Sequence, residues 1–215
     1  MSSTESPQKK IVTTSVGIYS KAIDSMQKTK SMMKDSPLTV LGLSLKQTPK
    51  MAETVEQSKI LCEDYIYSRL SGLVVDHDVP HEPPAVTPTI TDVSREIQLI
   101  GARLEATYPT LYQNISRQVN LPLKSEVAVR KALVSVGDYM FKHSVVTWGR
   151  IVALFAIASG IANECLQNGH PELIWSIVTL FSELVEKHAA AWICKQGGWV
   201  RRIWSLYGFT IWWVG

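Results

Sequence analysis

Four consecutive residues, Thr147, Trp148, Gly149 and Arg150, open the most apolar stretch of the chain. A threonine at this place can accept a hydrogen bond from the first free N–H groups of a helix, and a glycine lets another backbone approach closely. The arginine guanidinium is a planar fork that suits a carboxylate. The four residues therefore predict a place where an acidic, helical segment docks.

Histidines and cysteines are the other residues that could do chemistry, and the chain has five and three of them. His143, His170 and His188 have no metal-ligand partner three or four residues further on, and the sequence contains no phosphate-binding glycine loop or nucleophile elbow. We expect no catalytic residue, no metal site, no cofactor and no enzyme activity. The odd number and wide spacing of the cysteines predict reduced thiols in a cytosolic protein, namely Cys62, Cys165 and Cys194.

Composition supports one globular domain. The 215 residues are 46% hydrophobic and 19% charged, which is enough apolar material for a sizeable core. A net charge of +3 is too small to indicate nucleic-acid binding, although it allows weak attraction to an anionic membrane surface. The first ten residues are not followed by an apolar run, so no secretory signal is expected.

Apolar residues recur at helical spacing along most of the chain, and no convincing strand alternation is seen. Residues 51–70 predict a helix, Thr91 or Asp92 can cap the next, and Pro109 starts another that Pro122 ends. Further helices are expected from Ser125, from Trp148 to about Gln167, and from Pro171 to Gly197-Gly198. Because the helix from Trp148 is apolar on nearly every face, the predicted fold is an all-α bundle around one buried helix.

The chain divides into three parts on this interpretation. Residues 1–50 are rich in Ser, Thr and Lys and predict a flexible arm, and residues 51–200 form the helical domain. Residues 201–215 form an apolar segment rich in tryptophan. The uncharged runs 151–163 and 203–215 are each 13 residues long, about 20 Å as helix, which is short of a bilayer core of about 30 Å. The last run is therefore an interfacial segment or a truncated anchor, or equally a final helix packed on the domain.

Four segments occur in the order found in the Bcl-2 family of apoptosis regulators. Val55–Leu70 is similar to the fourth homology motif of the family, Val93–Leu104 to the third, Thr147–Arg150 to the first and Trp192–Trp199 to the second. The chain therefore resembles this family from about Val55 to Trp199. Within the family, the segments 109–118 and 121–126 and the threonine at 147 are most similar to one branch of membrane-permeabilising effectors.

The resemblance implies a helical bundle with a surface groove that binds an amphipathic helix of another family member. Carried over residue by residue, the groove would be lined by Val136, Met140, Thr147, Gly149, Arg150, Val152 and Phe155, with Arg150 pairing with an aspartate of the bound helix. The chain's own third motif would consist of Val93, Ile97, Ile100, Gly101 and Leu104, packed in the core of the resting fold.

Two departures from the family pattern are visible. The third motif normally reads Gly-Asp, whereas this chain has Gly101-Ala102 and lacks the acid that would reach a partner's arginine. The segment between Phe141 and Thr147 is one residue longer than expected, which affects the rim of the groove.

Two functions follow from the resemblance. The first is a pro-survival receptor that sequesters the death-motif helices of other family members, favoured by the Arg150 motif and by Ala102. The alternative is a pro-apoptotic effector that permeabilises membranes, favoured by overall likeness and by the apolar central segment. Either protein is expected in the cytoplasm and on intracellular membranes, the mitochondrial outer membrane or the endoplasmic reticulum, and neither is expected to bind nucleic acid.

Overall fold

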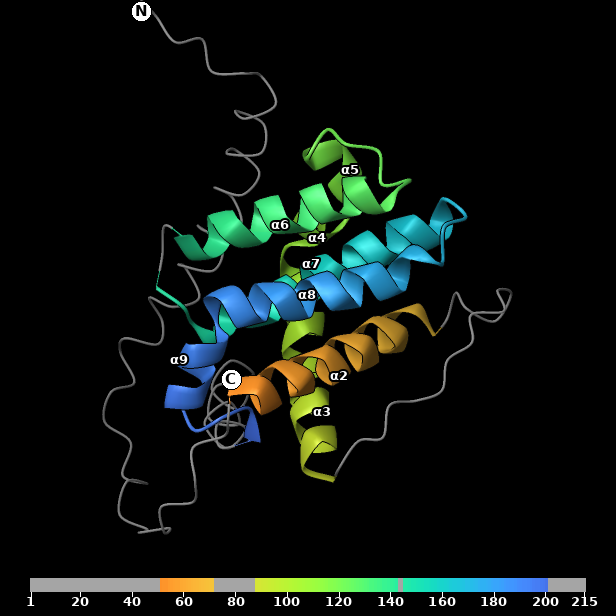
Figure 1. The fold of residues 1–215 in the computed structure, drawn as a ribbon. Coiled ribbons are helices and arrows are strands. Elements are labelled where there is room, and N and C mark those ends of the chain that lie inside the picture. Colours follow the sequence, from red (N-terminus) through yellow and green to blue (C-terminus); the bar gives the residue numbers. More distant parts are fainter. Residues whose placement is uncertain (1–50, 72–87, 143–144, 201–215) are drawn as a thin grey trace, which may run out of the picture.

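The computed structural model describes residues 51–71, 88–142 and 145–200. The regular secondary structure in these ranges is helical, with short connections between the helices (Figure 1). The helices are α2 (Met51–Leu70), α3 (Pro88–Thr107), α4 (Pro109–Tyr112), α5 (Ile115–Gln118), α6 (Glu126–Lys142), α7 (Trp148–Gln167), α8 (Leu173–His188) and α9 (Ala190–Lys195). No strand occurs within these ranges, as the sequence predicts.

Helix α7 is the centre of the bundle. Fifteen of its residues are buried, and it contacts α2, α3, α4, α5, α6 and α8. The helix begins as predicted, because Thr147 has extended backbone angles and its side chain accepts a hydrogen bond from the Arg150 N–H. An apolar surface on every side requires neighbours on every side, and the surrounding helices supply them.

The outer helices use the apolar stripes that the sequence predicts. On α2, Cys62, Ile66 and Leu70 are buried, and on α6 the face of Val129, Leu133, Val136 and Met140 is buried. Helices α2, α6, α7 and α8 run alongside one another, whereas α3 crosses them steeply (Figure 1). Helix α9 contacts both α2 and α8.

Several helix boundaries differ from the prediction. Helix α3 begins at Pro88 rather than after Thr91 or Asp92, because a proline tolerates the first turn, where its missing N–H needs no partner. The helix expected from Pro109 to Pro122 is instead two short helices separated at Asn114, whose backbone is left-handed (φ 54°).

The last predicted helix is also divided in two. Helix α8 starts at Leu173, two residues after Pro171, and ends at His188 instead of continuing to the glycines. Ala189 leaves helical geometry (φ −122°), and α9 follows in a new direction and ends at Lys195. Gly197 and Gly198, both with positive φ, lie in the turn after it. The position of α9 comes from contacts with α2, described below, which local sequence does not reveal.

Within the described residues, one helix is long and apolar enough to cross a membrane. It is α7, and 78% of its apolar window is buried in the structure. The uncharged run 151–163 lies inside this helix, which reaches 20 residues because it also includes Arg150 and Glu164, as the predicted range from Trp148 to about Gln167 requires. The predicted arm (1–50) and the tryptophan-rich segment 201–215 lie outside the described residues.

Candidate partner-helix groove

Arg150, the predicted ligand-pairing residue, lies in the first turn of α7 and is only 4% exposed. Its backbone N–H is held by the Thr147 hydroxyl, and its guanidinium Nη1 donates to the carbonyl oxygen of Val145. These contacts fix the arginine at the junction between the α6–α7 connection and the central helix. Gly149 beside it and Thr147 are both half-buried.

The apolar residues predicted to line the groove lie on α6 and α7, and all of them are buried. The exposed fractions are 1% for Val136, 4% for Met140, 2% for Val152 and 0% for Phe155. In this conformation they are part of the continuous hydrophobic core. A partner helix could therefore reach them only if this part of the bundle opens.

Phe155 occupies the aromatic centre of the core. Its ring lies 4.4 Å from that of Phe181 on α8, 5.7 Å from Tyr65 on α2 and 6.0 Å from Trp199, measured between centroids. Tilted and edge-on aromatic pairs at these distances add stability beyond the area that they bury. Phe155 thus connects the central helix to three other parts of the fold.

The first and second sequence motifs meet at Trp148. Its ring makes edge-on contacts with Trp192 at 5.3 Å and with Trp199 at 5.7 Å, again between centroids. The Trp199 indole N–H donates to the Thr54 carbonyl oxygen at 2.9 Å, and the Thr54 hydroxyl lies 3.2 Å from the sulfur of Cys194. The tryptophans at 148 and 199 are therefore core residues, and Trp199 attaches the segment after α9 to the start of α2.

The third motif is seated in the core along α3. The residues that form its apolar stripe are all 5% exposed or less: Val93, Ile97, Ile100 and Leu104. Gly101 lies against the ring of Tyr65 from α2, so closely that an added Cβ would stand 2.0 Å from the Tyr65 hydroxyl oxygen. In the resting fold this motif is part of the hydrophobic core, as predicted.

Comparison with known proteins agrees with this arrangement. The family model of apoptosis regulator proteins of the Bcl-2 family matches residues 97–199. The chain is 37% identical over 163 residues to the Danio rerio Bcl-2-related ovarian killer protein homolog A, covering 71% of this chain and 73% of that protein. The chain belongs to the Bcl-2 family.

Two solved structures extend this finding to the fold of this Bcl-2 family member. The crystal structure of chicken BOK matches with a TM-score of 0.64 and 34% identity, over 72% of this chain and 96% of that one. The Trichoplax adhaerens protein trBcl-2L2, solved bound to trBak BH3, matches with a TM-score of 0.60 at 23% identity, over 68% of this chain and 94% of that one. The branch of the family indicated by the segments at 109 and 121 is that of the Bok proteins, and the comparisons confirm the likeness of the chain to them.

The structure also shows polar contacts between α2 and α3 that were not predicted from the sequence of this Bcl-2 family chain. Ser94, Gln98 and Glu105 bind side chains of α2 and form a polar flank on the third-motif helix. Their spacing of i, i+4 and i+11 is a helical stripe, so a search for a second stripe beside the apolar one could have found them.

A hollow of about 200 Å³ lies outside the predicted groove, at the junction of α2, α3, α4 and α7. Its walls are Arg69, Leu70, Glu105, Pro109, Tyr112, Gln113, Ala156, Ser159, Gly160 and Asn163. None of the residues predicted to line the groove borders it, and ligand pockets are usually larger, about 300–1,000 Å³.

Proposed function

We propose that this chain is a regulator of apoptosis that binds the death-motif (Bcl-2 homology 3) helices of other Bcl-2 family proteins in a groove between α6 and α7, with a pro-survival outcome. The observation that carries the proposal is the position of Arg150. Thr147 caps the backbone N–H of Arg150, and the guanidinium donates to a backbone carbonyl. An arginine fixed in this way, on a helix that carries the buried Val152 and contacts α6 with its buried Val136 and Met140, suits a ligand with apolar anchors and one carboxylate. The trBcl-2L2 structure, which holds trBak BH3, is support from the same fold.

Burial of the groove residues adds a requirement to this proposal. Binding must be coupled to an opening between α6 and α7, since Met140 and Val152 are closed off in the free chain. The measured association constant is then the intrinsic association constant of the open form multiplied by the fraction of molecules that are open. We expect weaker binding than a preformed groove would give, and a slow association step.

Ala102 supports the pro-survival direction. A chain that offers its own third motif to a partner groove would leave the partner's arginine without a counter-charge, which costs on the order of 2–5 kcal/mol. A chain with an Arg150 groove and no acid at position 102 is thus better suited to accept helices than to donate one.

The alternative is a Bok-like effector that permeabilises the mitochondrial or endoplasmic reticulum membrane. The specific observation in its favour is the likeness to proteins named Bcl-2-related ovarian killer, together with one helix long enough to cross a bilayer. An effector needs its own third motif for self-association in this family, and the missing acid should weaken that step.

Two measurements test the proposal. Titration calorimetry with an amphipathic peptide that carries the Gly-Asp pattern should give binding, and the same peptide with Asp replaced by Ala should bind at least tenfold more weakly. Equal affinities would remove the role of Arg150. Dye release from liposomes of mitochondrial lipid composition separates the two functions: release at low protein concentration would contradict the pro-survival assignment and support the effector.

A further inference from the structure

Helix α3 carries a second stripe beside its apolar one. Ser94, Gln98, Gly101 and Glu105 recur at i, i+4, i+7 and i+11, and this spacing places them on one flank of the helix. The flank lies against α2. We call its polar contacts the polar seam, made by Asp64, Tyr65, Ser68 and Arg69 of α2 with Ser94, Gln98 and Glu105 of α3.

The N-terminal half of the seam is built around Asp64. Its carboxylate accepts hydrogen bonds from the Ser94 hydroxyl and from the Gln98 amide, the latter at 2.9 Å. The same amide nitrogen lies 3.1 Å from the Ser94 oxygen, and the Gln98 carbonyl oxygen accepts from the Ser68 hydroxyl at 3.1 Å. Both the amide nitrogen and the side-chain oxygen of Gln98 are thus hydrogen-bonded to α2.

The C-terminal half is built around Glu105. Its carboxylate accepts from the Tyr65 hydroxyl at 2.8 Å and pairs with the Arg69 guanidinium at 3.5 Å. Arg69 also donates to the backbone carbonyl of Gln98 at 3.0 Å. Gly101, in the middle, has no side chain, and so the Tyr65 ring can lie flush against the helix.

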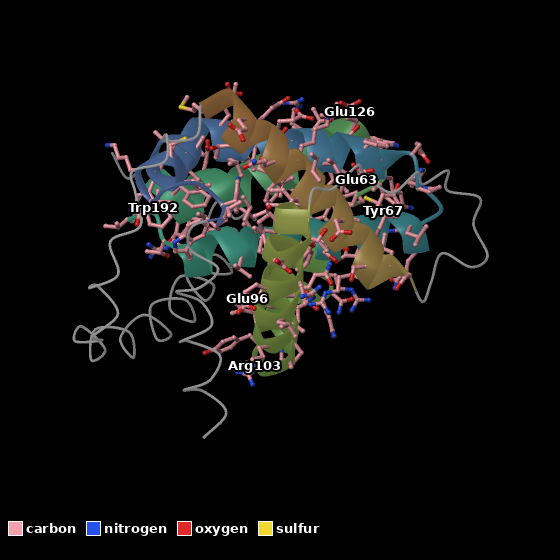
Figure 2. The ribbon with its side chains drawn as sticks, turned by 90° about the horizontal axis from the view of Figure 1, so that it is seen from below. Glu63, Tyr67, Glu96, Arg103, Glu126 and Trp192 are labelled. Atoms are coloured by element: carbon pink, nitrogen blue, oxygen red, sulfur yellow. The ribbon has the colours of Figure 1, made fainter. Side chains whose placement is uncertain are left out.

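The opposite flank of α3 lies about half a helical turn away from the seam residues. Figure 2 shows Glu96 and Arg103 on the side of α3 that faces away from α2, whereas Glu63 and Tyr67 mark α2 on the other side. The polar contacts of α3 with α2 are therefore directional. They hold one flank of the helix, in addition to the apolar stripe that faces the core.

The two stripes contribute differently if α3 leaves the bundle for an apolar groove on another molecule. The apolar residues are buried before and after the transfer, so most of their hydrophobic free energy is retained. The seam contacts are lost unless the acceptor repeats the chemistry of α2, and hydrogen bonds to charged groups are the stronger ones.

We propose that the polar seam, rather than the apolar stripe, determines whether α3 stays in its own chain. The seam sets the local opening equilibrium of the third motif. An acceptor able to remove α3 must offer a carboxylate opposite Ser94 and Gln98 and a guanidinium opposite Glu105. This goes beyond the proposed groove, because it concerns α3 as a donor and not α6 and α7 as a receptor.

Amide hydrogen exchange of the full chain, read by mass spectrometry for each helix, tests the proposal. In Asp64→Ala we expect the amides of α3 to exchange at least tenfold faster, with α7 and α8 unchanged, because only the seam is weakened. In Ile97→Ala, which removes a residue of the apolar stripe, α7 and α8 should accelerate together with α3, because the whole core loses stability. Arg130→Ala, which breaks an exposed ion pair to Glu183, is the matched control and should change neither.

Two outcomes would overturn the proposal: α3 exchange in Asp64→Ala at the wild-type rate, or acceleration of α3 only in step with α7 and α8. If Asp64→Ala does not fold, Ser94→Ala, which removes the Ser94 hydroxyl from Asp64, and Gln98→Ala, which removes the Gln98 contacts with Asp64 and Ser68, must show the same selective effect on α3. Peptide binding to the Arg150 groove is measured separately by calorimetry, so a failure here is distinct from a failure of the proposed function.

Discussion

The ring of Tyr65 fills the space that a side chain at Gly101 would need. A Cβ built at position 101 would lie 2.0 Å from the Tyr65 hydroxyl oxygen and 2.7 Å from the ring carbon that bears it. Both contacts are far below van der Waals distance, and the ring is buried between α2 and α3. In the resting fold, packing within the chain therefore requires a residue without a side chain at this position of the third motif.

Gly101→Ala should destabilise the protein, although alanine is the better helix former. We expect the free energy of unfolding to fall by about 1–3 kcal/mol through overpacking against Tyr65, measured by urea denaturation. In a Tyr65→Ala background the clash is absent, and the same change should raise stability by about 0.5–1 kcal/mol through helix propensity. The same loss in both backgrounds would show that Tyr65 is not the cause.

Glu164 should hold the second short helix in place. Its carboxylate on α7 accepts hydrogen bonds from the N–H groups of Ile115 and Ser116, the first N–H groups of α5, where Asn114 provides no side-chain cap. We expect Glu164→Gln to lower the free energy of unfolding by about 1–2 kcal/mol, as for loss of a charged cap. Chemical denaturation measures the change in the free energy of unfolding. Glu183→Gln, which weakens the half-exposed ion pair between Glu183 and Arg130, is the control and should cost about 0.5 kcal/mol or less. Equal costs for the two variants would contradict the capping role.

Asp138 should make stability depend on pH. Burial alone would raise the pKa of this carboxyl, but hydrogen bonds from Lys187, Lys142 and His188 outweigh burial and hold the pKa well below its usual value. Because the folded-state pKa is depressed, the stabilisation is complete above the unfolded pKa of about 4 and is lost progressively as the pH falls below it.

Asp138→Asn should therefore cost about 1 kcal/mol at pH 7, a modest value because the two lysines are half-exposed. The difference from wild type should stay constant down to about pH 5 and shrink below pH 4. Urea denaturation at several pH values measures this. A difference that is independent of pH would mean that the charge of Asp138 does not contribute.

The sequence was sufficient to predict a helix and its buried face where both are determined by the residues of that helix. The cap at Thr147, the buried faces of α2 and α6 and the central position of α7 all follow from local patterns. The divisions at Asn114 and Ala189 could not be predicted, because distant residues cause them. Glu164 supplies the cap of α5 from 49 positions away along the chain, and the bond from Trp199 to Thr54, 145 positions apart, holds the region after α8 against α2.

The resemblance predicts which residues line the groove but not whether they are exposed. Val136, Met140, Val152 and Phe155 all belong to the hydrophobic core of the bundle, and Arg150 is buried at the start of α7. Periodicity does not tell whether such residues line an open surface or a closed core, since both need an apolar stripe. Phe155 is the clearest case, because its contacts with Tyr65, Phe181 and Trp199 depend on three elements distant in sequence.

A double-mutant cycle between Arg150→Ala in the protein and Asp→Ala in a Gly-Asp peptide tests the central claim most directly. Titration calorimetry of the four combinations gives the coupling energy between the two groups, free of the cost of opening the bundle, which is common to both peptides. We predict a coupling of about 1.5–3 kcal/mol for a buried charge-assisted pair. Additive effects, with a coupling below about 0.5 kcal/mol, would contradict the assignment of Arg150 as the residue that binds the partner's acid.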